Sequence, residues 1–303
     1  MDTTTAETVR ETVEKTTPPH PVVYDYLRHD KIMPTVWCEG CSIGTIFAAL
    51  MRAIDRVKLS KDDGVMVSGI GCSSRMPIYA DFCAMHTTHG RPIAFATGIK
   101  LANPRFHPIV VTGDGDCLAI GGNHFIHAAR RNIGITVILV NNNIYGMTGG
   151  QYSPATPEGK RSSTSPYGSI ERPFDACELA KACGASFVAR GTSYAAMELD
   201  KLISRALQKK GFALVEIMSH CHTLYGRWNK MPSPVEMLQL EKSHAVNVAQ
   251  AARLAPEAMK DKFVTGVLQD LDIPEYTEVY EGVIERARKE YQDELAAEAI
   301  RGE

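Results

Sequence analysis

Two short polar runs carry the strongest chemical signal in the chain. Gly113–Asp116 reads GDGD after the apolar run PIVVT, and Asn141–Asn143 reads NNN after TVILV. The segment between them has room for one helix. Because neighbouring parallel strands end at the same sheet edge, we expect the Asp114 carboxylate, the Asn142 amide oxygen and the Ile144 carbonyl to lie close together. Such oxygen ligands suit Mg²⁺, whose shell is completed by water and phosphate, so the pattern predicts a magnesium–diphosphate site.

The plainer interpretation of these residues is a glycine turn followed by an asparagine-rich loop that binds nothing. The spacing of the two runs, each after an apolar strand, favours the cofactor site. Glycine turns at helix N-termini suit anions, so backbone N–H groups near Gly113, Gly115 and Ser73 are predicted to contact phosphate. Met147 and Thr148 follow the asparagine run and are expected to close over the cofactor, although Met147 could equally fill a core.

Composition narrows the class of protein. The chain has 303 residues, 44% of them hydrophobic, which is enough for one large domain with a substantial core. The net charge of −2 gives no basic footprint for nucleic acid. No apolar run reaches membrane-spanning length, and the polar N-terminus lacks signal-peptide features. We therefore expect a cytoplasmic protein without nucleic-acid or membrane partners.

The pattern along the chain divides it into three parts. Residues 1–20 are predicted to be a flexible arm, residues 21–228 an α/β domain with a doubly wound, mostly parallel sheet, and residues 229–303 a helical extension without a strand. A charged helix is expected over 278–300. The predicted helices of the domain span 42–57, 93–103, 121–130, 175–183 and 194–209, and the predicted strands span 64–71, 108–112, 135–140 and 213–218.

Four of the eight cysteines lie where predicted strands or helices begin or end. Cys38 and Cys41 form a C-x₂-C pair before a helix, and Cys72 and Cys221 each follow a strand. Four thiolates gathered at one sheet edge could hold a [4Fe–4S] cluster. A thioredoxin-type redox pair, a structural zinc site and plain core residues are the alternatives. The remaining four are predicted to be core thiols within helices: Cys83, Cys117, Cys177 and Cys183.

Taken together, the motifs resemble one family. WCxGC, GIGCSS, HGR, GDGD, IGxNHxxHAxRRN, NNxxYGMTGGQ and SHCxT follow one another over about residues 36–227. This order resembles the β subunit of two-subunit 2-oxoacid:ferredoxin oxidoreductases, especially their 2-oxoglutarate branch, although pyruvate enzymes carry nearly the same motifs. GDG followed by NN alone resembles the broader thiamine-diphosphate signature. The resemblance implies a fold of the thiamine-diphosphate-binding type.

The resemblance also implies the cofactors. One [4Fe–4S] cluster would be ligated by the C-x₂-C pair with Cys72 and Cys221, and Mg²⁺ by Asp114, Asn142 and the Ile144 carbonyl. The residues expected to contact thiamine diphosphate are Gly71, Ser73, His89, Gly113, Asp114, Gly115, Asp116, Asn142, Ile144, Met147 and Thr148. The implied reaction is oxidative decarboxylation of a 2-oxoacid to acyl-CoA and CO₂, or its reverse, with coenzyme A as co-substrate and ferredoxin as electron partner.

Two residues are candidates for contact with the substrate. Arg75 could bind a substrate carboxylate through two parallel hydrogen bonds, with a surface salt bridge as the alternative. His89 could donate a hydrogen bond to the diphosphate or the substrate, with a purely structural histidine as the alternative. Thiamine enzymes also need a carboxylate at the aminopyrimidine ring, and no glutamate in the matched motifs suggests itself. The resemblance implies that an α subunit supplies it, in a heterodimer or α₂β₂ heterotetramer.

Two other functions compete with this interpretation. A cluster-free thiamine enzyme, such as a decarboxylase or carboligase, would ordinarily be a much longer chain. A metal-binding electron-transfer subunit would use the cysteines alone, with GDGD as a turn and no thiamine. The chain has no C-x₂-C-x₂-C-x₃-C run, so it carries no ferredoxin-like module. An external ferredoxin would have to dock near the single cluster.

Overall fold

The computed structural model describes residues 21–28 and 34–301, so the predicted arm over 1–20 lies outside the described residues. The centre of the protein is an eight-stranded sheet with the order β2-β1-β3-β4-β8-β7-β10-β9. Six neighbouring strands are parallel, which confirms the predicted doubly wound α/β sheet. These strands are β1 (Gly64–Ser68), β2 (Cys83–His86), β3 (His107–Gly113), β4 (Thr136–Asn141), β7 (Phe187–Thr192) and β8 (Ala213–Met218).

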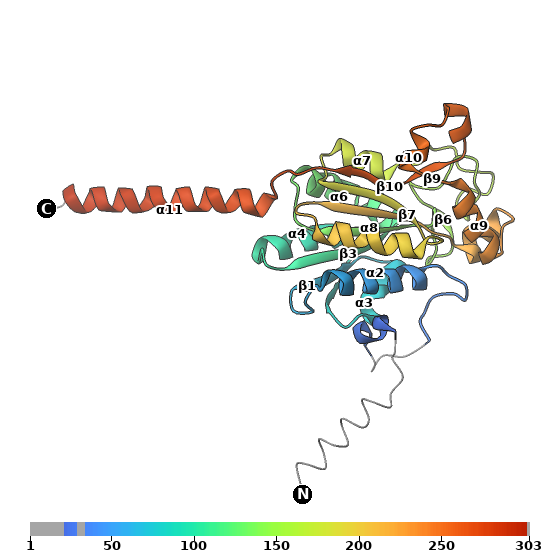
Figure 1. Cartoon of the computed structure of the whole chain (residues 1–303), viewed down its shortest axis with the longest axis horizontal. Helices are drawn as coiled ribbons and strands as arrows, with labels where there is room; N and C mark the ends of the chain where they lie inside the picture. The colour runs from blue at the N-terminus through green and yellow to red at the C-terminus, as the bar shows by residue number, and fades with distance from the viewer. Residues whose placement is uncertain (1–20, 29–33, 302–303) are drawn as a thin grey trace, which may run out of the picture.

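Helices cover both faces of the sheet (Figure 1). One face packs against α2 (Ile43–Val57), α3 (Met76–Tyr79) and α8 (Ala196–Gln208), and the other against α4 (Pro92–Ala102), α6 (Gly122–Arg130) and α7 (Ala176–Ala182). Side chains of a strand alternate between the two faces, so Met66 joins the first core and Val67 the second. Burial on both sides explains why the central strands are continuously apolar. The predicted helices and strands of this region agree with the structure to within three residues.

Strands without an apolar run escaped prediction. All four residues of β2 are exposed at the edge of the sheet, and Arg190 and Gly191 interrupt the apolar pattern of β7. The prediction that Cys83 is a core thiol in a helix is wrong, because Cys83 begins β2 and is exposed. Cys117 and Cys177 are buried in helices as predicted, whereas Cys183 follows the end of α7 and is half-buried.

The C-terminal part is helical only in part. It contains α9 (Pro234–His244), β9 (Ala245–Asn247), α10 (Val248–Ala251), β10 (Phe263–Asp270) and α11 (Tyr276–Arg301). The prediction that residues 229–303 hold no strand is wrong, because β10 pairs antiparallel with β7 and extends the main sheet. The predicted charged helix is confirmed as α11, which extends away from the body of the protein (Figure 1). In the described part of the chain, no helix has the length and apolar character needed to cross a membrane.

Candidate active site

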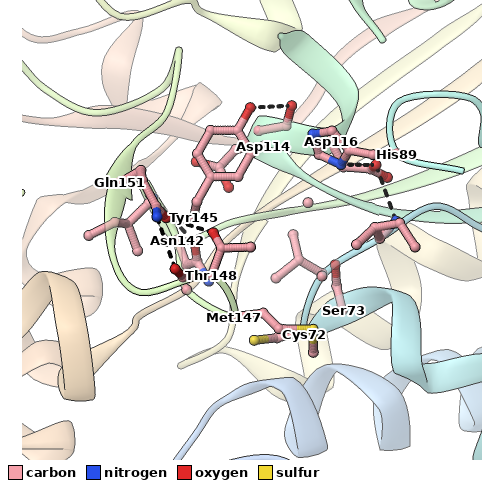
Figure 2. A pocket seen from close by; sticks show the side chains of 17 residues that line it. Cys72, Ser73, His89, Asp114, Asp116, Asn142, Tyr145, Met147, Thr148 and Gln151 are labelled. Carbon is pink, nitrogen blue, oxygen red and sulfur yellow. Dashed lines mark hydrogen bonds and ion pairs between the residues drawn. The ribbon is translucent and has the colours of Figure 1, made fainter. Parts of the chain in front are cut away.

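A cavity of about 450 Å³ opens at the carboxyl ends of the central strands. Its wall contains every residue that the sequence predicted to contact thiamine diphosphate, and Cys72 as well (Figure 2). In a parallel sheet of this kind, ligands bind where the strands end, so the position of the cavity fits the fold. Bringing these residues together does not itself establish their roles, which stay predictions.

Asp114 lies where β3 ends and the short helix α5 (Asp114–Leu118) begins. Its side chain is 2% exposed, and the Ser153 hydroxyl donates a 2.5 Å hydrogen bond to its Oδ2. Burial raises the pKa of Asp114 to about 7, even though the bond from Ser153 and backbone N–H groups lower it. Among the described residues, no lysine or arginine forms an ion pair with Asp114. A bound cation would supply the missing positive charge.

The asparagine run forms a tight turn where β4 ends. Asn143 has φ +61°, in the left-handed region that asparagine tolerates better than most residues. The Asn142 Oδ1 accepts a 3.3 Å hydrogen bond from the Ile144 N–H, and both residues line the cavity. Asn141 turns the other way, because its Nδ2 donates a 2.8 Å hydrogen bond to the buried Glu216. The turn leads into a short hairpin of β5 (Ile144–Tyr145) and β6 (Gln151–Tyr152).

Asp116 holds the cavity wall together. Its buried carboxylate accepts hydrogen bonds of 2.7 Å from Thr112 Oγ1, 2.7 Å from the Gly90 N–H and 3.2 Å from the Ile70 N–H. The Nδ1 of His89 lies 2.8 Å from Asp116 Oδ1 (Figure 2), which is an ion-pair distance, although the ring is not aligned for a hydrogen bond. These bonds fix the loops that shape the cavity. The predicted contact of Asp116 with the cofactor stays a prediction.

Tyr145 completes the wall next to His89. Its hydroxyl donates a 3.0 Å hydrogen bond to the Gly115 carbonyl, and its ring centroid lies 5.7 Å from that of His89. Burial, followed by the charges of Asp114 and Asp116, raises the pKa of Tyr145 to about 12, so the hydroxyl stays protonated. This residue is absent from the predicted contacts, although it stands inside the NNxxYGMTGGQ motif.

The structure gathers the four candidate cluster cysteines beside this cavity. Thr223 Oγ1 lies 3.8 Å from the sulfur of Cys38 and 3.7 Å from that of Cys221. A Cβ on Gly146, which lines the cavity, would lie 3.6 Å from the sulfurs of both Cys72 and Cys221. Burial, together with the nearby thiols, raises the pKa values of Cys41 and Cys72 to about 11. The thiols are thus close enough to interact, and the nearby positive charge of Arg75 offsets only part of the rise at Cys72.

The spacing of the sulfurs argues against a single zinc ion. With Zn–S bonds of about 2.3 Å, tetrahedral ligands lie about 3.8 Å apart. In the described part of the chain, the only three candidate ligand atoms within 4.8 Å of one another belong to Asp175, Cys177 and Glu216. No three of the four gathered cysteines are therefore that close. A four-iron cluster binds each cysteine to a different iron and accommodates the wider spacing.

Comparison with known proteins shows the family. Residues 69–217 match the family described as "Thiamine pyrophosphate enzyme, C-terminal TPP binding domain". Over 271 residues the chain is 48% identical to the 2-oxoglutarate synthase subunit KorB of Methanocaldococcus jannaschii, a match that covers 89% of this chain and all of that protein. The chain belongs to the KorB family.

Other members of the family agree. The KorB subunit of Archaeoglobus fulgidus is 55% identical over 199 residues, which cover 66% of this chain and 74% of that protein. A solved structure of the 2-oxoglutarate:ferredoxin oxidoreductase from Magnetococcus marinus, with 2-oxoglutarate, coenzyme A and succinyl-CoA bound, superposes with a TM-score of 0.78. It is 32% identical, and the match covers 88% of this chain and 90% of that chain.

Arg75 lies just outside the cavity wall. It is half-buried and three residues after Cys72, and its guanidinium makes no hydrogen bond or ion pair with any described residue. Burial lowers the pKa of His86, and the charge of Arg75 lowers it further, so the two side chains are near one another. The predicted alternative of a surface salt bridge therefore has no partner within the described residues. Because its guanidinium is unpaired in the described part of the chain, Arg75 is a candidate for binding a carboxylate beside the cavity.

Proposed function

We propose that this chain is the β subunit of a thiamine-diphosphate-dependent 2-oxoglutarate:ferredoxin oxidoreductase. A single observation carries the proposal: one cavity wall contains both the Asp114–Asn142 pair and Cys72, which belongs to the four-cysteine group. A thiamine enzyme without a cluster has no need of the cysteines, and an electron-transfer subunit has no need of the buried Asp114. Membership of the KorB family supports the same function.

The chain's own residues fit a metal-bound diphosphate. Asp114, Asn142 and the Ile144 carbonyl would hold Mg²⁺, because together they offer one buried negative charge and two neutral oxygens. Backbone N–H groups at Gly71, Ser73 and the glycine turn after β3 would contact the phosphates, and Met147 and Thr148 would close over the cofactor. When bound, thiamine diphosphate supplies the electron sink that makes decarboxylation of a 2-oxoacid feasible.

The cysteine group fits the [4Fe–4S] cluster that would accept electrons one at a time. Cys38, Cys41, Cys72 and Cys221 would each bind one iron, and ligation would keep as thiolates the buried thiols that otherwise stay protonated. Cys72 lines the cavity, so electrons would travel a short distance from the cofactor. Cys38 is exposed, which suits the docking of ferredoxin on this side.

A partner subunit completes the site. Among the described residues, the only acidic side chains in the cavity wall are those of Asp114, the proposed metal ligand, and Asp116, which accepts hydrogen bonds from the loops around it. The carboxylate that thiamine enzymes need would therefore come from an α subunit, as the name "subunit beta" of several relatives suggests. The exposed apolar side chains of Ile70 and Met147 at the cavity would be covered by that partner. We expect the β chain alone to be inactive.

The substrate assignment rests on relatives and on Arg75. The relatives named KorB are 2-oxoglutarate enzymes, and the Magnetococcus marinus enzyme was solved with 2-oxoglutarate and coenzyme A. In this chain, Arg75, whose guanidinium has no ion-pair partner among the described residues, would bind a substrate carboxylate. His89 would donate to the diphosphate or the substrate. Pyruvate is the alternative substrate, and it differs by lacking the distal carboxylate.

The composition of the purified α/β complex tests this function. We expect about four irons and four sulfides per β chain, bound thiamine diphosphate, and a brown colour that bleaches with dithionite. Iron without thiamine would instead identify an electron-transfer subunit. Thiamine with zinc in place of iron would remove ferredoxin from the reaction.

A further inference from the structure

We propose that Glu216 is a positioning residue that holds the Asn142 turn in the shape needed for the metal. The inference rests on the proposed function, because it assumes that Asn142 and the Ile144 carbonyl bind a divalent cation. It concerns a carboxylate that neither lines the cavity nor belongs to the predicted site. Glu216 lies within β8 and is 2% exposed. A buried carboxylate is costly unless it is paired, so its partners reveal what it does.

Glu216 has two kinds of partner. Its Oε2 accepts a 2.6 Å bond from Arg190 Nε, directly opposite on β7, and a 3.3 Å bond from the Cys177 thiol. Its Oε1 accepts a 2.8 Å bond from Asn141 Nδ2 at the end of β4. Arg190 also binds Asp175 at 2.5 Å. Asp175, Cys177 and Glu216 are spaced as metal ligands might be, but the guanidinium already bridges the two carboxylates and supplies the positive charge.

The bond to Glu216 fixes the orientation of the Asn141 amide. A carboxylate only accepts, so the amide nitrogen must face Glu216 and the amide oxygen must face the turn. That oxygen accepts a 3.2 Å hydrogen bond from the Asn143 N–H, which closes an Asx turn around Asn142. Asn143 is held in the left-handed region, and Thr156 Oγ1 donates a 2.6 Å bond to its carbonyl.

A continuous chain of bonds therefore runs from the sheet interior to the proposed ligands. Arg190 holds Glu216, Glu216 holds Asn141, and Asn141 sets the turn that presents Asn142 and Ile144 to the cavity. Glutamine could not replace Glu216, because its amide N–H₂ group would replace one of the two acceptor oxygens and would face a donor, either Arg190 Nε or Asn141 Nδ2. The alternative is that the Arg190–Glu216 ion pair only stabilises the packing of β7 against β8. That possibility predicts a loss of stability without a specific loss of metal affinity.

The test uses the α/β complex, stripped of metal and cofactor and then titrated with Mn²⁺ at saturating thiamine diphosphate. Calorimetry gives the Kd, and electron paramagnetic resonance reports the Mn²⁺ environment. We expect Glu216→Gln to weaken Mn²⁺ binding about 10- to 100-fold, the usual effect of losing a residue that orients a ligand, with iron content unchanged. If that variant fails to fold, the paired variant Glu216→Leu with Arg190→Leu leaves no unpaired charge between β7 and β8 and should still bind weakly.

Asp200→Asn is the matched control. Asp200 is 1% exposed and accepts two 2.8 Å bonds from Arg52 between α8 and α2, away from the cavity wall. We expect this substitution to lower the melting temperature and to leave the Kd for Mn²⁺ within about twofold of wild type, because the Arg52–Asp200 pair does not orient the metal ligands. The inference would be overturned if Glu216→Gln bound Mn²⁺ as tightly as wild type does. It would also be overturned if Asp200→Asn weakened Mn²⁺ binding as much as Glu216→Gln does.

The wild-type complex separates this inference from the proposed function. If wild type binds thiamine diphosphate without any dependence on Mn²⁺, the metal site itself is wrong and the role of Glu216 falls with it. If Mn²⁺ dependence is present in wild type and lost in Asp114→Ala, the metal site stands. The behaviour of Glu216→Gln then decides the positioning role alone.

Discussion

The ring of Tyr145 lies so close to Gly115 that no side chain fits between them. A Cβ built on Gly115 would meet the ring at 2.2 Å, and the Tyr145 hydroxyl donates a hydrogen bond to the Gly115 carbonyl. The glycine thus lets the hairpin after β4 press onto the turn after β3. The two strand ends that carry Asp114 and Asn142 are held together by this contact.

Gly115→Ala should displace the Tyr145 ring and open the cavity wall. We expect thiamine diphosphate affinity, measured by calorimetry on the α/β complex, to fall about 5- to 100-fold, because overpacking typically costs about 1–3 kcal/mol. Gly122→Ala is the control, since nothing lies within 4 Å of a Cβ at that helical position. Equal affinity in the two variants would contradict the role of this contact.

Cys221→Ala should remove or degrade the cluster. The sulfur of Cys221 is near those of the other gathered cysteines, and its loss would leave one iron without a protein ligand. We expect iron per β chain to fall well below four, while Cys83→Ala, at an exposed cysteine that begins β2, keeps the wild-type value. An unchanged iron content in Cys221→Ala would show that this residue is not a ligand.

Arg75→Gln should weaken substrate binding specifically. Hydrogen bonds to a charged group contribute about 1.5–3 kcal/mol, so KM for 2-oxoglutarate should rise roughly 10- to 100-fold while iron and thiamine contents stay constant. Arg105→Gln removes an exposed ion pair with Asp63 and provides the control. Steady-state kinetics with ferredoxin as acceptor gives the KM of each variant. A KM that does not change would exclude Arg75 from the carboxylate site.

His107 should make the stability of the protein depend on pH. Burial, with a smaller effect of Lys100, lowers the pKa of His107 to about 4, and its Nε2 lies 3.0 Å from Thr136 Oγ1. The unfolded chain, with a histidine pKa of about 6.5, binds the proton more readily below that pH. The contribution of His107 to the free energy of unfolding is therefore fully present above about pH 6.5 and is lost as the pH drops toward 4. At pH 5 the loss is about 2 kcal/mol.

Thermal unfolding at pH 7.5 and pH 5 tests this effect. Between pH 7.5 and pH 5, the melting temperature of His107→Gln should fall less than that of wild type. The difference should be a few degrees for a chain of this size. His244→Gln, at a half-buried histidine that ends α9, should behave like wild type. Parallel pH profiles for all three proteins would rule out His107 as the source.

The ends of the central strands could be predicted from the sequence, so the site residues that follow those strands could be predicted as well. Asp114 and Asn142 each follow an apolar run, so a parallel sheet brings them to one edge whatever the loops do. Ser153 and Tyr145 contact the GDGD turn from 39 and 30 residues away, through a hairpin whose path depends on tertiary packing. Local pattern contains no such information. Their positions near the NN motif were the only available signal.

The fold shows the same limit. Central strands buried on both faces have unmistakable apolar runs, whereas β10 is half-buried, contains Gly266 and joins the sheet beside β7 from far along the chain. Its pairing partner could not be inferred from its own residues. The role of Glu216 was equally hidden, because a charged residue inside an apolar strand has meaning only once its neighbours on β4 and β7 are known.

Reduction of the cluster by substrate tests the central claim most directly. The anaerobic, oxidised α/β complex would receive 2-oxoglutarate and coenzyme A while visible absorbance and electron paramagnetic resonance follow the cluster. We predict bleaching that requires bound thiamine diphosphate and is faster with 2-oxoglutarate than with pyruvate. A complex that contains thiamine and iron, yet whose cluster stays oxidised with both acids, would contradict the assignment.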